Sequence, residues 1–395
     1  MKKDILRSHT VLLISLIWFM VQFLRYVFPP LFETFQSTYG VTNTQTGLLF
    51  TLLLIGYSSM QLPSGVIADR YDKKNVIVIG VALFTAASFS AIFAPTFGFL
   101  LLATALIGIG TGVHKTVAVA YLSIVHSKNT GSALGIMDTV GQFGGVVAPI
   151  LVVLLLDVTG YWQSVFLIGG AVGAALAALF VTYGETEYVH RSADTSSTSS
   201  NPQLSDYISS LLNPQLLSFT VVITIFTFLW NGIVSFLPLF LTTQKGFSTE
   251  LAGIAYSILF IASLVQAVTG TISDNFGSLK LSLGLFTLAT ISIILLVTVQ
   301  SWLAIFVAVG LIGIGFHGFR PIRDAYLMEL ISTDVGGGVL GTVRTVMTVI
   351  GGLAPVTVGF LIDLFGYTTS FSFLIVVILV GNAIIGVMLL TAKRT

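Results

Sequence analysis

Cysteine is absent from all 395 residues of the chain. Its absence excludes disulfide bonds, a thiol nucleophile, cysteine-based zinc sites and iron–sulfur clusters. Charged residues are scarce as well. They make up 8% of the chain and hydrophobic residues 55%, whereas a soluble domain carries roughly 25% charged residues. So few charges cannot cover a surface that faces water on every side. The mean hydropathy of +0.99 therefore indicates a protein that lies in a lipid bilayer.

Apolar runs of about 20 residues, the length with which an α-helix crosses the hydrocarbon core of a bilayer, recur along the chain. Polar or Gly/Pro-rich segments separate twelve such runs, near residues 10–32, 46–67, 75–95, 97–122, 131–155, 161–183, 216–242, 250–272, 279–299, 302–328, 337–361 and 367–391. The fold class that they predict is an all-α polytopic membrane protein with twelve transmembrane helices.

The longest polar interval, residues 184–214, has a Ser/Thr-rich centre and predicts a solvated linker loop. We therefore expect an N-terminal six-helix bundle at residues 1–183 and a C-terminal bundle at residues 215–395. With both termini in the cytoplasm, the cytoplasmic segments carry eleven Lys and Arg residues and the opposite side only Lys245. This asymmetry predicts a multi-pass protein of the cell membrane with cytoplasmic termini and linker.

An internal repeat links the two halves. The segment "LIGIGTGVHKTVAVAYL" (106–122) returns as "LIGIGFHGFRPIRDAYL" (311–327), displaced by 205 positions, so that Lys115 matches Arg320. With a displacement of 206, Asp138 matches Arg344. Because this displacement covers six helices, an even number, the two halves have one orientation in the membrane. They are expected to be related by a pseudo-twofold axis along the membrane normal.

The segment "GVIADRYDKK" (65–74) follows the second predicted helix. It resembles the signature loop of the major facilitator superfamily, G-x-x-x-D-R/K-x-G-R/K-R/K, with Asp72 in place of the second glycine. A degenerate copy, "GTISDNFGSLK" (270–280), follows the eighth helix, where that superfamily keeps its second copy. The resemblance covers essentially the whole chain and implies a secondary transporter that works by alternating access. It also implies a conformational latch at the cytoplasmic helix ends, formed here by Gly65, Asp69, Arg70, Lys73, Lys74 and Asp274.

Two other patterns of that superfamily fit poorly. The Arg usual in the fourth helix, three residues before G-x-G, is Ala105 here. The fifth-helix G-P-x-x-G-G pattern of drug/proton antiporters is replaced by "GQFGGVVAP" (141–149). Both departures argue against a multidrug exporter.

Away from the helix ends, where Glu250 and Lys280 lie, seven charged residues lie inside predicted helices. Charge is costly there unless it meets a partner, a cavity or a pathway. Five are basic and two acidic, a net charge of +3 that favours anions. Arg can also hold a carboxylate or phosphate through two parallel hydrogen bonds. The candidate substrate-binding residues are Arg25, Lys115, Arg320, Tyr26, Gln142 and Asn231.

Each of these candidates has an alternative. Lys115 and Arg320 lie towards the cytoplasmic side of their helices and could belong to an inner gate, in which Lys115 would pair with Asp138 and Asp324 with Arg344 or Arg320. Arg25 could pair with Glu33 or extend to the outer surface. Polar side chains such as Gln142 and Asn231 often join neighbouring helices in membranes.

A second group of residues is predicted to couple protons or to form the gate: Asp138, His114, His317, Asp324 and Arg344. Asp138 is the favoured proton carrier, because loss of water in the membrane interior favours the neutral form of a carboxyl group. His114 and His317 can also titrate near neutral pH, although a single His on an apolar face is commonly a packing residue.

We therefore predict a secondary active transporter of a small organic anion, a carboxylate or a phosphate-bearing compound, by proton-coupled symport or anion exchange. The alternatives are a drug/proton antiporter that exports amphipathic compounds and a non-transporting membrane sensor. No enzyme, metal site or cofactor is expected, since the chain has no metal-ligand spacing, nucleophile-and-base set or phosphate-binding loop. The expected partners are the anionic substrate, the lipid bilayer and, for symport, a proton. We expect a monomer that binds no nucleic acid.

Overall fold

The computed structural model describes residues 2–127, 129–185, 210–331 and 336–392, and the side chains of residues 9–127, 129–185, 210–331 and 339–391. Most of the predicted linker (186–209) therefore lies outside the described residues, as do Lys128, Arg191, Lys393 and Arg394. The described part of the chain is helical and contains no strand.

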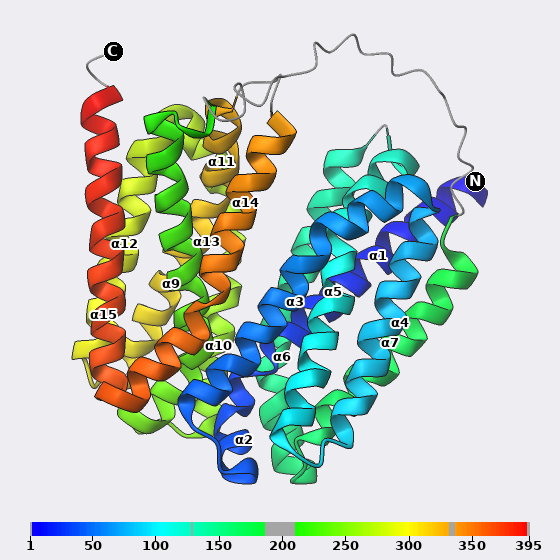
Figure 1. Ribbon diagram of the computed structural model, residues 1–395, viewed down its shortest axis with the longest axis horizontal. Helices are drawn as coiled ribbons and strands as arrows, with labels where there is room; N and C mark the ends of the chain where they lie inside the picture. Colours follow the sequence, from blue (N-terminus) through cyan, green and yellow to red (C-terminus); the bar gives the residue numbers. More distant parts are fainter. Residues whose placement is uncertain (1, 128, 186–209, 332–335, 393–395) are drawn as a thin grey trace. The chain divides into compact units, whose positions relative to one another are not determined.

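The helices of the first half run from α1 to α7 (Figure 1). Their bounds are α1 Lys2–Tyr26, η1 Pro29–Leu31, α2 Phe32–Tyr39, α3 Asn43–Arg70, α4 Lys73–Ile92, α5 Phe97–Val125, α6 Thr130–Thr159 and α7 Gln163–Tyr183. In the second half they are α9 Pro214–Lys245, α10 Thr249–Ile261, η2 Ala262–Val265, α11 Gln266–Phe276, α12 Ser278–Thr298, α13 Trp302–Leu330, α14 Gly336–Gly352 and α15 Ala354–Ala392.

Eleven stretches of the described chain are long and apolar enough to cross a membrane. The last one, Val339–Thr391, has 53 residues, about 80 Å of helix at 1.5 Å per residue, which is far more than one bilayer needs. Gly366 interrupts it with φ 79° and ψ 168°, a conformation that only glycine adopts readily. It therefore holds two spans, and the prediction of a twelve-helix all-α membrane protein is confirmed.

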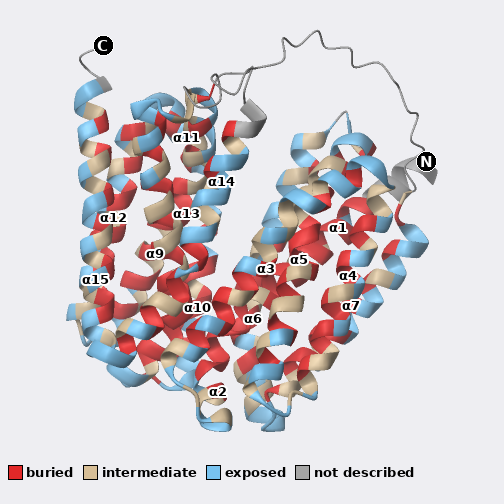
Figure 2. Cartoon of the chain, viewed as in Figure 1, coloured by how far each residue is buried: buried red, intermediate tan, exposed pale blue. Residues whose placement is uncertain are grey.

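Large apolar side chains on the outward helix faces point away from the protein interior. Leu62, Phe93, Val158 and Leu390 are 67–78% exposed, whereas buried residues lie between the helices (Figure 2). Water would disfavour so much exposed apolar surface, and lipid does not.

The chain divides into two compact units. Unit 1 contains α1 to α7 together with Ser235–Phe260, the end of α9 and nearly all of α10. Unit 2 contains the rest of the described second half. Within unit 1, Phe236 packs on Phe32 at 5.4 Å between ring centroids, and the Ser257 hydroxyl donates to the Val146 carbonyl at 2.9 Å. The division into bundles 1–183 and 215–395 thus stays a prediction from the repeat.

The repeat is visible in the backbone as well as in the sequence. Gly160 ends α6 with φ 72°, and the matching Gly366 has φ 79°. Gly40 ends α2 with φ 66°, and Gly246, 206 positions later, follows α9 with φ 66°. Left-handed glycines often end helices. Gly160 and Gly366 share a positive φ, but their ψ angles, 0° and 168°, differ, so the chain turns differently after them. What the two halves share is a glycine with positive φ at corresponding points.

Glycines in unit 1 bring helix backbones together. A Cβ at Gly108 would lie 2.3 Å from the Leu53 carbonyl oxygen, and one at Gly112 would lie 2.2 Å from that of Tyr57. A Cβ at Gly144 would lie 2.2 Å from the Phe19 carbonyl oxygen. These glycines allow α5 to pack closely on α3, and α6 on α1.

Candidate functional site

Four basic side chains inside predicted spans lie over aromatic rings. The Arg25 guanidinium is 4.0 Å from the centre of the Tyr57 ring, and the Lys115 ammonium is 4.9 Å from the Trp18 ring. In unit 2, Arg320 lies 4.9 Å from the Trp230 ring and Arg323 lies 5.7 Å from the Phe226 ring. The ring faces carry partial negative charge and hold cations in place of water.

In unit 1, Trp18, His114, Lys115 and Asp138 form a group that we call the tryptophan cluster. The Lys115 ammonium forms an ion pair with the Asp138 carboxylate. The His114 ring stacks on the Trp18 ring, with 6.0 Å between centroids and 19° between planes. His114 is 2% exposed, and its ring nitrogens make no hydrogen bond to any described residue that meets geometric criteria. Lys115 is thus held by one ring and one carboxylate.

Close packing by glycine positions Trp18. A Cβ at Gly141 of α6 would lie 1.9 Å from Cδ1 of Trp18 and 2.4 Å from its Nε1. The indole therefore occupies the space that a side chain at position 141 would fill. Asp138 lies three residues before Gly141 on the same helix, α6. Gly141, the first residue of the "GQFGG" segment, thus positions the ring that lies against Lys115.

Arg25 lies two turns further along α1. Seven residues separate it from Trp18, so the two side chains leave nearly the same face of the helix about 10 Å apart. Arg25 makes no ion pair with a described acidic residue. Glu33, its alternative partner in the sequence, instead accepts a 3.5 Å hydrogen bond from the Thr242 hydroxyl. The Tyr57 hydroxyl lies within the electrostatic reach of both Arg25 and Asp138, which links the arginine to the tryptophan cluster.

Unit 2 contains a similar arrangement. The His317 ring meets the Trp230 ring edge-on at 4.8 Å, and Arg320 lies over the same indole. Each half thus places a tryptophan of its first helix against a histidine and a cation of its fourth. The cations match in the repeat, but the histidines do not, because a displacement of 205 places Phe319 opposite His114.

The other predicted gate residues are arranged differently from the first expectation. Asp324 pairs with its neighbour Arg323, with 2.8 Å between Nη2 and the carboxylate. Arg344 is exposed and makes no ion pair with a described residue. The Asn231 amide donates to the Gly351 carbonyl at 2.9 Å and so joins two helices. Tyr26 is buried against Phe260 at 4.3 Å, and Gln142 is half-buried beside Gly141.

The predicted latch residues lie at helix ends. Asp69, Arg70 and Asp274 are exposed, and Gly65, Lys73 and Lys74 are half-buried. Asp72, the departure from the signature, caps α4 by accepting a hydrogen bond from the Lys74 main chain at 2.7 Å.

Two side chains hold the end of α7 beside the latch. The Lys74 ammonium donates to the Gly184 carbonyl at 2.7 Å. The Tyr121 hydroxyl donates to the Glu185 carbonyl at 2.6 Å. The role of Tyr121 could not be predicted, because one tyrosine in an apolar helix matches no motif.

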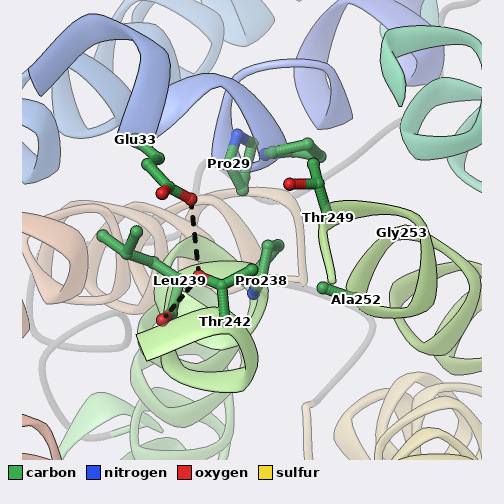
Figure 3. Close-up of a pocket in the computed structure, with 9 residues that line it drawn as sticks. Pro29, Glu33, Pro238, Leu239, Thr242, Thr249, Ala252 and Gly253 are labelled. Atoms are coloured by element: carbon green, nitrogen blue, oxygen red, sulfur yellow. Dashed lines mark hydrogen bonds between the residues drawn. The ribbon is translucent and has the colours of Figure 1, made fainter. Parts of the chain in front are cut away.

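A small pocket lies beside the helix break of α1 (Figure 3). Pro29, Pro30 and Glu33 form one wall, and Pro238, Leu239 and Thr242 form another. The figure shows the Glu33 carboxylate directed at Thr242. Two proline-containing segments, Pro29–Pro30 and the α9 segment around Pro238, thus line the same pocket. No group of three metal-binding side chains occurs among the described residues.

A chain of long apolar helices with charged residues inside its spans is an integral membrane protein. A family model described as Major Facilitator Superfamily matches residues 14–300. The chain therefore belongs to the major facilitator superfamily and is a transporter, not an enzyme.

Named relatives are distant. A probable sulfoacetate transporter of Cupriavidus necator is 24% identical over 394 residues, covering 92% of this chain and 89% of the relative. The 3-(3-hydroxy-phenyl)propionate transporter of Escherichia coli is 24% identical over 313 residues, 77% of this chain and 75% of the relative. A methyl viologen resistance protein of Salmonella typhimurium is 29% identical over 152 residues, 38% of this chain and 30% of the relative.

A solved structure shares the fold. The crystal structure of a bacterial homolog to the human lysosomal transporter Spinster, in an inward-facing and unoccupied conformation, aligns with a TM-score of 0.80. It is 17% identical in sequence, and the alignment covers 96% of each chain.

Proposed function

We propose that this protein transports a small organic anion across the cell membrane by alternating access of its two halves. The observation that carries the proposal is Arg25, a half-buried cation inside a membrane span, held on the Tyr57 ring without an acidic partner among the described residues. An isolated charge at such a place is costly and is usually retained for function. A guanidinium that is already oriented loses little freedom when it binds a carboxylate or sulfonate.

The names of two relatives support the same substrate class. One is a probable transporter of sulfoacetate and the other a transporter of a hydroxyphenylpropionate. At 24% identity they support the class of compound rather than a particular one. Proton-coupled symport and anion exchange are both compatible with this proposal, in which the protein acts as a monomer with cytoplasmic termini.

Two roles are open to Lys115 within this proposal. Its ammonium can bind the substrate, or its ion pair with Asp138 can close a gate. Uptake by a Lys115→Gln variant separates the roles, since a substrate ligand is needed for binding and a gate contact is not. Arg320, over Trp230 in unit 2, is the matching second ligand.

Export of amphipathic cations is the second candidate function, favoured by the partial match to a methyl viologen resistance protein. The charges of unit 1 argue against it. Within its spans Arg25 and Lys115 outnumber Asp138, and this excess of positive charge repels a cation.

Ligand-induced thermal stabilisation of the purified protein tests the proposal. The panel comprises benzoate, 3-(3-hydroxyphenyl)propionate, methanesulfonate, sulfoacetate and methyl viologen. We expect stabilisation by at least one anion and its loss in Arg25→Gln. Lys280→Gln, which removes an exposed cation of α12, is the matched control and should retain it. Stabilisation by methyl viologen alone would refute the proposal.

A further inference from the structure

We propose that Asp138 is an internal substitute for the anionic group of the substrate, so that one proton on Asp138 is exchanged for one anionic group on Lys115. This inference rests on the proposed function and deepens it. It selects proton symport over exchange and predicts that a monoanion moves without net charge.

The ion pair itself is the first argument. Asp138 and Lys115 come from different helices, α6 and α5, and their side chains are 53% and 30% exposed. An exposed ion pair inside membrane spans is costly in lipid, so the exposed face belongs to a space that water can reach. The contact that a substrate would make with Lys115 is thus already made by a carboxylate that solvent and solute can displace.

The mounting of Lys115 is the second argument. Its ammonium stays over the Trp18 ring, which is buried and fixed against Gly141. When Asp138 leaves, the cation therefore remains oriented for a second carboxylate or a sulfonate. Asp138, at the more exposed end of the pair, is the partner that can be replaced.

Charge balance is the third argument. With Asp138 ionised, Arg25, Lys115 and Asp138 sum to +1 in unit 1, and with Asp138 protonated they sum to +2. A proton on the Asp138 carboxylate yields a neutral carboxylic acid and a free ammonium. An anion that then binds Lys115 restores the sum to +1. Proton and anion thus favour each other's binding, and this coupling is reciprocal.

The helices packed against α6 carry several ionisable side chains among the described residues. They are His114, Lys115 and Tyr121 on α5, Arg25, Tyr26 and His9 on α1, and Tyr183 on α7. Tyr57 on α3 is within the electrostatic reach of Asp138. None of these described side chains is a carboxylic acid, so among them Asp138 alone can release Lys115 by taking up a proton. His114 is the rival proton site, since it touches the same indole.

The test measures anion affinity against pH, using whichever member of the anion panel stabilises the wild-type protein. We expect affinity to rise about tenfold per pH unit as pH falls, as long as the free protein carries an ionised Asp138, and then to level off, since one proton is bound per anion. Asp138→Asn should bind the anion at all pH values with little pH dependence. In proteoliposomes it should lose accumulation driven by a pH gradient and keep counterflow of preloaded anion.

Asp157→Asn, an exposed acid on the same helix, is the control and should behave as wild type. If Asp138→Asn folds poorly, the double variant Lys115→Gln/Asp138→Asn replaces it, because that variant removes both charges of the ion pair. Its residual anion binding should be weak and independent of pH. A wild-type pH dependence in Asp138→Asn, or its loss in His114→Gln alone, would overturn the inference and leave anion transport standing. No anion binding by the wild type at any pH would overturn both.

Discussion

A methyl group at position 141 is expected to displace the indole of Trp18. The Cβ of Gly141→Ala would lie 1.9 Å from Cδ1 of Trp18, whereas carbon atoms in contact are at least about 3.5 Å apart. Trp18 is 6% exposed, so the ring or the helix must shift by about 1.5 Å within a packed interior.

The energetic cost can be bounded from two contributions. Overpacking a buried site costs about 1–3 kcal/mol. Moving the ring also weakens the contact with Lys115, 4.9 Å from its centre, and such contacts contribute about 0.5–2 kcal/mol. We therefore expect Gly141→Ala to lose roughly 1.5–5 kcal/mol of stability, with a changed tryptophan emission spectrum.

Thermal unfolding of the purified variants in detergent checks this expectation. Gly135→Ala on the same helix is the matched control, because nothing lies within 4 Å of its new Cβ. Alanine there favours the helix by up to about 1 kcal/mol, so this variant should melt at or above the wild-type temperature. Trp18→Leu should relieve the clash and make Gly141→Ala less harmful in the double variant. If Gly141→Ala has the same melting temperature as Gly135→Ala and the tryptophan emission spectrum of the wild type, Gly141 does not position the indole.

Three further outcomes are expected in the same thermal assay. Asp72→Ala removes the N-terminal cap of α4 and should cost about 0.5–2 kcal/mol, while Asp72→Asn should cost much less. Tyr121→Phe removes the hydroxyl that holds the end of α7 at 2.6 Å and should cost about 1 kcal/mol; an unchanged melting temperature would contradict a role for that bond. Gly112→Ala, whose Cβ would lie 2.2 Å from the Tyr57 carbonyl, should melt well below Gly98→Ala, which meets one atom at 3.9 Å.

Helix number and internal duplication could be predicted from the sequence because both depend on local patterns. Apolar length determines a span, and repeated letters reveal a repeat. The pairing of Lys115 with Asp138 was also accessible, since both lie at similar depth on consecutive helices. The prediction that Asp324 pairs with Arg344 or Arg320 was wrong, because its ion pair is with the adjacent Arg323. The choice among these arginines depends on side-chain directions, which the sequence does not show.

The cation–π contacts of these basic side chains could not be predicted. Trp18, Tyr57 and Trp230 are three of many aromatic residues in a chain that is 12% aromatic, and nothing in their spacing marks them. Their roles depend on which helices face each other. Close contacts at glycines determine this, and the sequence does not show which residues those glycines contact. The sequence did contain a signal for Gly141, because small residues repeated at helical spacing indicate close approach of a neighbouring helix. It contained no signal that the approaching group is the indole of Trp18.

The two halves share one feature and differ in another, and the difference bears on the proposed proton coupling. Both halves hold a cation over a tryptophan, Lys115 over Trp18 and Arg320 over Trp230. At the position that carries Asp138 in unit 1, however, unit 2 carries Arg344. An acid can release its cation by taking up a proton, whereas an arginine stays charged at every physiological pH. A proton can therefore act on the cation site of unit 1 in a way that has no equivalent at the matching position of unit 2. We accordingly expect the double variant Asp138→Arg/Arg344→Asp to lose proton coupling rather than to move it to unit 2. Arg320 would gain an acid, but Lys115 would gain a repelling positive charge that no proton can neutralise.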